Sequence, residues 1–535
     1  MTNNEKTIIG VDVGSGSVRA GVFNLDGELL AHAKQDITLF RSAGSIVEQS
    51  SQEIWQAVCF TIKEAIKQAG VSPKSVAGIG FDATCSLVVI GDNKEPLAVG
   101  PTDDPNRNII VWMDHRAIEQ AERINATKHS VLNYVGGTIS PEMETPKILW
   151  LKENRPHIYQ KAHHFFDLAD YLTWRATGDL ARSVCTVTCK WTYLAHEKRW
   201  DADYFHQIGL SELADENFAR IGQNVVDPGT PCGQGLLEEA AHEMGLPVGT
   251  HVAVGLIDAH AGGIGTVGIK NGALANMAYV FGTSSCTMTT TQKEVFVPGV
   301  WGPYYSAMVP GCWLNEGGQS AAGAAIDQLV NFHPASAEAH QLAKKAGVSL
   351  PVYLANLVLE KVKSPSDAVN LAKGIHIVPE FLGNRAPFAD PDAKAVIAGL
   401  GMERDLDNLV ALYVAGLCGI GYGLRQILDA QKACGIQCEN IIISGGAGQH
   451  PLVRQILADT AGIPIVSTQC SEPVLLGSAI LGAVAGNVAA SLPEAMKQFT
   501  KVDQVYNSEA RYSAVHQRRY EAYKALQKTA KLIRE

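Results

Sequence analysis

Two segments near the middle of the chain carry residues that could transfer a phosphoryl group. In Gly255–Gly263, Asp258 ends an apolar stretch and stands among glycines and alanines. The turn Gly282-Thr283-Ser284 follows shortly after it. A carboxylate among small residues lets a hydroxyl approach closely, and the exposed backbone amides of such a turn can bind an anion. The pair predicts phosphoryl transfer to an alcohol, with Asp258 as the general base. The alternative is that Asp258 only caps a helix.

A third motif lies near the start of the chain, where Asp12 ends an apolar strand and precedes a glycine-serine turn. A buried carboxylate without a partner is costly at such a point. We interpret Asp12 as a ligand of Mg²⁺ that bridges nucleotide phosphates; the alternative is that it caps the turn. The residues predicted to surround those phosphates are Gly14, Ser15, Gly16, Ser17 and Arg19.

A fourth motif, Gly445-Gly446-Ala447-Gly448, connects an apolar strand to a helix. Alone it could serve close strand-helix packing, and Gly282-Thr283-Ser284-Ser285 alone could be an ordinary hairpin turn. Because the three turns recur in order through two α/β halves, we interpret them together as amide donors for the β- and γ-phosphates and a glycine floor for adenosine.

A set of polar residues in apolar or turn contexts could hold a sugar. Polyols are bound by several charged groups that make paired hydrogen bonds, whereas each residue alone could form an exposed salt bridge instead. We assign no chemistry to His115 or His260. The predicted sugar ligands are Asp82, Ala83, Thr84, Trp112, Asp114, Glu144, Lys190 and Glu316.

Composition limits the classes of function. The chain has 535 residues, 46% of them hydrophobic and 18% charged, which predicts two large domains. A net charge of −10 without a long basic block argues against nucleic acid or an anionic membrane as partner. No leader peptide is expected at the polar start, and the apolar stretch 473–492 is interpreted as a core helix because it is rich in glycine, alanine and serine.

The eleven cysteines are scattered, which is typical of a reducing cytosol, and we expect a cytoplasmic protein. Cys185/Cys189 and Cys434/Cys438 are each four residues apart, without the CxxC spacing or a matching pair of histidines. We therefore expect no zinc site at either pair.

The order of elements predicts a duplicated α/β architecture with a ligand cleft between the halves. Residues 8–13 and 18–23 form a predicted strand-turn-strand, followed by a helix over 51–69 and a buried strand over 76–81. The pattern recurs in the second half, in strands over 276–281, 286–291 and 440–444 and a helix over 451–461. Segment 331–372 is predicted to be a helical insertion and 490–535 closing helices. We place the boundary near 260–270, giving domains 1–265 and 266–535.

The motifs together resemble the FGGY carbohydrate kinases along nearly the whole chain. Further matching segments are Trp112–Arg116, Pro146–Trp150 and Asn384–Pro387. The resemblance implies two domains of the actin/hexokinase (ribonuclease H-like) type, ATP and Mg²⁺ in a central cleft, and closure on the substrate. Gly323 matches a nucleotide-contacting glycine of the family, and Gln449 stands in the adenosine loop where some relatives have Asn.

Within this family, Asp82-Ala83-Thr84-Cys85-Ser86 resembles the D-ribulokinase branch, whereas xylulokinases and glycerol kinases carry a glutamine-containing motif there. Lys190 and Glu316 also resemble ribulokinase sugar ligands. The resulting hypothesis is ATP-dependent phosphorylation of a ketopentose, D-ribulose to D-ribulose 5-phosphate. The alternatives are a kinase for L-ribulose, ribitol or xylulose, a nucleotide-dependent sugar-binding protein without catalysis, and a sugar-sensing regulator. A homodimer is left open.

Overall fold

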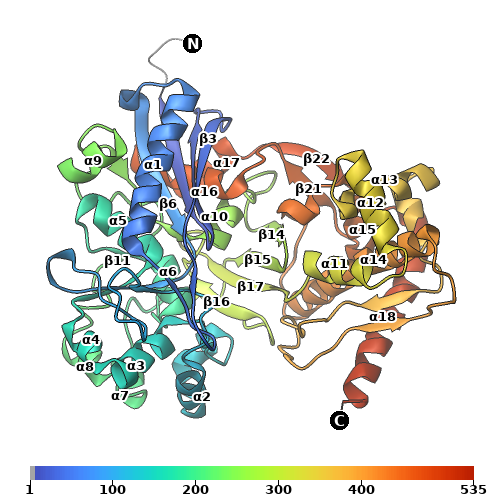
Figure 1. Ribbon diagram of the computed structural model, residues 1–535, viewed down its shortest axis with the longest axis horizontal. Helices are drawn as coiled ribbons and strands as arrows, with labels where there is room; N and C mark the ends of the chain where they lie inside the picture. The colour runs from blue at the N-terminus through green and yellow to red at the C-terminus, as the bar shows by residue number, and fades with distance from the viewer. Residues whose placement is uncertain (1–5, 535) are drawn as a thin grey trace.

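The computed structural model describes residues 6–534, which form two halves, each built around a β-sheet (Figure 1). The first half holds a sheet in which β1 and β2 are antiparallel and β6 lies parallel to β1, with β12 and β13 pairing on the far side of β6. Its strands are β1 (Thr7–Val13), β2 (Ser17–Phe23), β3 (Leu29–Asp36), β6 (Val76–Ala83), β12 (His251–Val252) and β13 (Leu256–Ile257).

The second half repeats this arrangement. β14 and β15 form an antiparallel hairpin, and β20 lies parallel to β14, as β6 lies parallel to β1. This repetition confirms the predicted two-domain α/β architecture. The strands follow the order β16-β17-β15-β14-β20-β21-β22, with bounds β14 (Asn276–Phe281), β15 (Ser285–Thr291), β16 (Trp301–Tyr305), β17 (Trp313–Gln319), β20 (Asn440–Ser444), β21 (Ile465–Thr468) and β22 (Val502–Tyr506).

Helix α1 covers the first sheet and has the predicted bounds, Ser51–Ala69. It begins where the Ser50 side chain accepts a hydrogen bond from the Glu53 N–H, and it ends at Gly70 in the left-handed conformation. Serine is a favoured residue at the start of a helix and glycine at its end, so both ends of α1 are capped by suitable residues. Its apolar face, which includes Ile54 and Ile62, is completely buried.

Helix α16 (Pro473–Ala485) comes from the second half of the sequence but packs on β1 and β6 of the first sheet, so it appears in red among the blue strands of Figure 1. The contact is a backbone contact, because a Cβ at Gly10 or Gly80 would collide with the α16 carbonyls of Leu475 or Ser478. The apolar stretch that begins at Pro473 is therefore a core helix, as predicted. It completes the first half from the far end of the chain.

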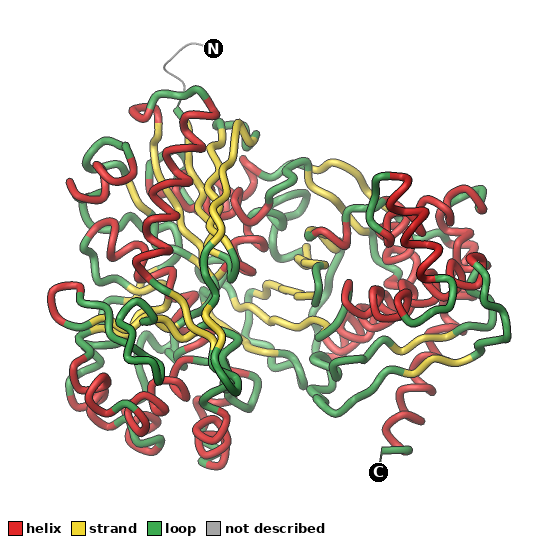
Figure 2. The backbone as a smooth tube through the Cα atoms, in the orientation of Figure 1, coloured by secondary structure: helices red, strands yellow, loops and turns green. Residues whose placement is uncertain are grey.

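The outer helices of the second half are drawn in red in Figure 2 around the strands in yellow. The predicted insertion 331–372 contains α12 (Ser336–Ala346) and α13 (Leu350–Lys361). The sequence predicts closing helices over 490–535; this segment contains α17 (Leu492–Phe499) and α18 (Ser513–Leu532), but strand β22 lies between them. That strand was missed because its residues are largely exposed and give no apolar alternation.

Helix α14 (Leu406–Ala433) is the single helix within residues 6–534 that is long and apolar enough to cross a membrane. In the fold, 78% of its most apolar window is buried. It packs on α15 (Pro451–Ala461), α11 (Gly323–Asn331) and β18 (His376–Val378), which makes it the central helix of the second half.

Candidate active site

Three aspartates meet at one edge of the first sheet. Asp12 and Asp82 are direct partners on the parallel strands β1 and β6. β13 pairs with β6 in the next position, Leu256 opposite Asp82, so Asp258 follows at the same edge as the first residue of α10 (Asp258–Ile264). The carboxyl ends of parallel strands share an edge, which is where α/β sheets place their ligands. The predicted base and the predicted metal ligand therefore lie together.

The three carboxyl groups lie close enough to repel one another when ionised, so their common edge is suited to binding a cation. Burial and the Asp12 charge raise the pKa of Asp258 to about 7, and the same two causes raise the pKa of Asp82 well above its ordinary value. Asp82 accepts a hydrogen bond from Ser478 through Oδ2, while its buried Oδ1 has no partner. Several hard oxygen ligands and an unpartnered carboxylate oxygen fit a Mg²⁺ ion.

The first phosphate turn joins β1 to β2 and is held by two side chains. Gln49 donates to the Ser15 carbonyl at 2.7 Å, and the Trp112 indole donates to the Ser15 hydroxyl at 2.9 Å. Arg19, predicted to face phosphate, lies against the Asp12 carboxylate and also donates to Glu472 at 2.6 Å. Its guanidinium therefore already balances two of the acidic groups around the cleft.

The middle residue of each predicted turn is exposed: Gly16 in the first, Thr283 in the second and Gly446 in the third. A cavity of about 680 Å³ lies beside the second and third turns. This cavity brings together the predicted nucleotide residues Gly282, Thr283, Gly323, Gly446, Ala447 and Gln449. Its volume falls in the range of small-molecule sites.

Two glycines at or next to this cavity are required by the backbone. Gly445 has a φ of 91°, and a Cβ there would collide with the Phe281 carbonyl oxygen. A Cβ at Gly323 would lie 2.7 Å from the Gly282 carbonyl oxygen. The first N–H groups of α11 donate to this second turn, Gly323 to Gly282 at 3.0 Å and Ala324 to Thr283 at 3.1 Å, and so fix its shape.

The predicted sugar ligands Lys190 and Glu316 come from different halves and lie close enough for their charges to interact. Lys190 ends α6 (Val184–Lys190), and Glu316 lies in the middle of β17. Glu316 contacts the Nε2 atom of His260 at 3.3 Å. Burial would raise the pKa of Glu316, but His260 and Lys190 outweigh it and lower that pKa to about 2. Glu316 is therefore a permanent negative charge beside the cleft.

Glu144, the first residue of α3 (Glu144–Asn154), is fully buried and neither of its carboxylate oxygens has a hydrogen-bond partner. The nearest cation is Lys147, whose Nζ lies 3.8 Å away. Burial raises the pKa of Glu144 to about 7. A buried carboxylate with free oxygens suits a ligand that brings its own hydroxyl donors.

The structure gives Asp114 internal partners. Both of its oxygens accept hydrogen bonds from Arg116, and Oδ2 also accepts from the Val47 N–H at 2.7 Å. Arg116 also pairs with Glu48 at 2.9 Å, and all three side chains are almost completely buried. This ion-pair cluster holds the segment that carries Trp112, whose backbone N–H donates to Ser86 at 3.1 Å. A direct contact of Asp114 with sugar stays a prediction.

Several residues that line the nucleotide cavity are not among the predicted site residues. They come from α11, from the start of α13, from the middle of α14 and from the start of α15, so the predicted insertion supplies part of the wall. No motif marks them: most are apolar helix residues, which look alike whether they face a core or a ligand, and the polar ones stand alone in the sequence. They are Ile326, Asp327, Ser349, Pro351, Val352, Tyr413, Leu417 and Val453.

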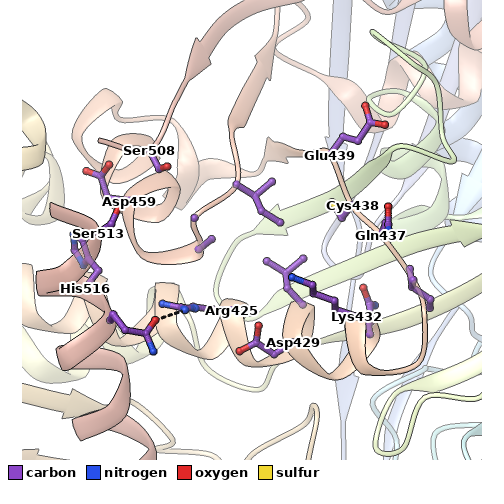
Figure 3. Close-up of a pocket in the computed structure, with 17 residues that line it drawn as sticks. Arg425, Asp429, Lys432, Gln437, Cys438, Glu439, Asp459, Ser508, Ser513 and His516 are labelled. Carbon is purple, nitrogen blue, oxygen red and sulfur yellow. Dashed lines mark hydrogen bonds between the residues drawn. The ribbon is translucent and has the colours of Figure 1, made fainter. Parts of the chain in front are cut away.

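A second cavity, of about 560 Å³, lies in the second half between α14, the segment just before β20, the end of α15 and the start of α18 (Figure 3). Its wall carries charges of both signs, with Arg425, Lys432 and Asp429 on α14, and Arg425 donates to Gln517 of α18 at 2.6 Å. The lining of this cavity contains none of the predicted site residues. The cleft edge of the two sheets is therefore the candidate active site.

Family models match both halves of the chain. The model described as the FGGY family of carbohydrate kinases, N-terminal domain, matches residues 7–265, and its C-terminal counterpart matches residues 277–486. The chain belongs to the FGGY family of carbohydrate kinases. The predicted family and the predicted enzyme class, a carbohydrate kinase, are thereby confirmed.

Relatives of this FGGY kinase extend over its full length. An FGGY carbohydrate kinase domain-containing protein of Homo sapiens is 44% identical, covering 97% of this chain and 96% of its own. A D-ribulokinase of Saccharomyces cerevisiae is 40% identical over 90% of this chain and 72% of its own. A ribulokinase of Mycolicibacterium smegmatis is 29% identical. These relatives place the kinase with ribulokinase-like enzymes.

Solved structures share the fold of this FGGY kinase. A xylulose kinase from Rhodospirillum rubrum superposes with a TM-score of 0.81 at 20% identity, covering 99% of both chains. A Plasmodium falciparum glycerol kinase with ADP gives 0.77 at 17% identity, covering 98% of both. At such identities the likeness shows the fold, which is the predicted two-domain actin/hexokinase-like architecture.

Proposed function

We propose that this kinase transfers the γ-phosphoryl group of ATP to the 5-hydroxyl of D-ribulose, forming D-ribulose 5-phosphate. The observation that carries the proposal is the place of Asp258, a half-buried carboxylate beside Asp12 and Asp82 at the cleft edge of the first sheet. The choice of sugar is supported by the 40% identity with a D-ribulokinase. The small Ala83, next to Asp82 on β6, leaves room for a ketose.

In this proposal Asp258 accepts the proton of the sugar hydroxyl as that oxygen attacks phosphorus. Its pKa near 7 suits a group that must take up a proton at neutral pH. The amides of the Gly14–Ser17 and Gly282–Ser284 turns hold the phosphates. Asp12 would hold Mg²⁺, which when bound neutralises charge on the transferred group.

The test is a substrate panel on the full chain. ADP release is measured with D-ribulose, L-ribulose, D-xylulose and ribitol, and ³¹P NMR identifies the phosphorylated carbon. We expect the highest kcat/KM for D-ribulose, with phosphate on C5. A higher kcat/KM for another sugar would make that sugar the substrate in place of D-ribulose. If calorimetry detects sugar binding but no sugar of the panel leads to ADP release, the non-catalytic alternative would be favoured.

A further inference from the structure

Three metal-ligating side chains that the proposed reaction does not use lie together beside the cleft. Cys185 and Cys189 are four residues apart on α6, so both sulfurs face the same side of that helix. His260 reaches them from α10, and one ligand atom from each of the three lies within 4.8 Å of the others. This third ligand could not be predicted, because His260 is far from the cysteines along the chain.

The distances fit a thiophilic metal. The Cys185 sulfur lies 3.1 Å from Nδ1 of His260. Around a tetrahedral Zn²⁺, sulfur and nitrogen ligands are roughly 3.5 Å apart, so a small movement of the side chains would admit the ion. Two thiols and one imidazole are ligands that Zn²⁺ prefers, whereas Mg²⁺ prefers the oxygens at Asp12.

The orientation of the histidine provides an independent observation. Nδ1 of His260 faces the cysteine, while Nε2 contacts the Glu316 carboxylate at 3.3 Å. Histidines that bind zinc commonly donate their other ring N–H to a carboxylate, which fixes the tautomer that coordinates the metal. The ring is 1% exposed and therefore has little freedom to turn away.

We propose that Cys185, Cys189 and His260 form a binding site for one Zn²⁺ ion, with Glu316 as the residue that positions His260. α6 and α10 belong to the first half of the molecule and β17, which carries Glu316, to the second. A filled site therefore ties the two sheets together next to Asp258. The Glu316 side chain is 12% exposed, which gives the otherwise buried cluster an opening toward the cleft.

The experiment uses the metal-free full chain under reducing conditions, titrated with Zn²⁺ against a chromophoric chelator. We expect one ion per chain and a higher melting temperature when the ion is bound. X-ray absorption of the zinc-loaded protein should show two sulfur ligands at about 2.3 Å. Co²⁺ in place of Zn²⁺ should give the charge-transfer absorption of cobalt-bound thiolate.

Variants test the ligands. Cys185→Ser and Cys189→Ser should lose the stoichiometric ion, and Glu316→Gln should weaken zinc binding about 10–100-fold through the freed histidine ring. The matched control is Cys434→Ser with Cys438→Ser, which removes the other cysteine pair at the same spacing and should leave zinc binding unchanged. Zinc without sulfur ligands in the absorption spectrum, or loss of zinc in the control alone, would overturn the proposal even if a Cys185 variant failed to fold.

Discussion

Asp12 and Asp82 are direct partners across the parallel ladder of β1 and β6. Two carboxylates on neighbouring strands repel each other, and one of them, Asp82, is fully buried with an unpartnered oxygen. Arg19 offsets part of this charge through Asp12. Burial and the Asp12 charge raise the pKa of Asp258 and make it a stronger base than an ordinary aspartate, and a bound Mg²⁺ would offset the repulsion among the three carboxyl groups.

Asp258→Asn should lower kcat by about 10²–10⁴-fold, the range for loss of a general base. The KD for ATP should stay within about twofold, because the nucleotide cavity lies on the second half of the molecule. Steady-state kinetics and calorimetry check the two numbers. Asp92→Asn, at an exposed aspartate, is the control. A drop in kcat of less than tenfold would remove Asp258 from the role of base.

Gly445→Ala should lower stability by about 1–3 kcal/mol, since the new Cβ meets the Phe281 carbonyl and φ stays positive. It should also raise the KM for ATP, because the third turn would shift. Gly446→Ala is the matched comparison for stability: no atom lies within 4 Å of its Cβ. Equal melting temperatures for the two variants would contradict the assignment of strain to Gly445.

Glu144→Gln should change how stability depends on pH. The pKa of Glu144 is about 7 in the folded protein and about 4.5 when unfolded, so the unfolded chain releases this proton first as pH rises. Wild-type stability should therefore fall between pH 4.5 and 7, by roughly 3 kcal/mol at most, and this loss should be absent from the variant.

Urea unfolding of the sugar-free protein from pH 5 to 8 measures this difference. The control is Glu119→Gln, at an exposed glutamate of α2 (Ile118–Ala126), which should follow the wild-type curve. Parallel curves for wild type and Glu144→Gln across this range would show that Glu144 titrates as an ordinary carboxyl.

Asp114→Asn should destabilise the protein by roughly 3 kcal/mol, because it leaves the buried Arg116 charge with Glu48 as its remaining carboxylate. Asp36→Asn, which breaks the exposed pair between Lys34 and Asp36, should cost less than about 1 kcal/mol. Chemical denaturation compares the two. Equal small losses would mean that Asp114 contributes little to the fold and would favour direct contact with sugar.

Elements with strong local patterns could be predicted to the residue. The helix at Ser51–Ala69 has buried residues at four-residue spacing and capping residues at both ends. The strand at Asn440–Ser444 is a buried apolar run followed by a glycine turn. β22 could not be predicted, because it is an exposed edge strand that is held by pairing with β21 rather than by apolar burial.

In the candidate site, too, residues with a local sequence pattern could be predicted, whereas contacts made by the tertiary fold could not. Asp12, Asp258 and Thr283 could be singled out as candidate site residues from local composition alone, because each lies at or just after the end of a buried strand. The contact of Glu316 with His260 was not predictable, because it joins two elements that only the tertiary fold brings together. Asp114 shows the converse: a polar residue in an apolar context proved to have a partner two residues away, Arg116.

The return of α16 to the first sheet has a consequence for biosynthesis. Strands β1 and β6 emerge early from the ribosome, but the face formed by Gly10, Gly78 and Gly80 stays uncovered until the segment after Pro473 has been made. The first sheet therefore lacks one of its covering helices until translation is nearly finished. Nascent chains of this kinase should depend on chaperones that shield apolar strands more than their compact final shape suggests.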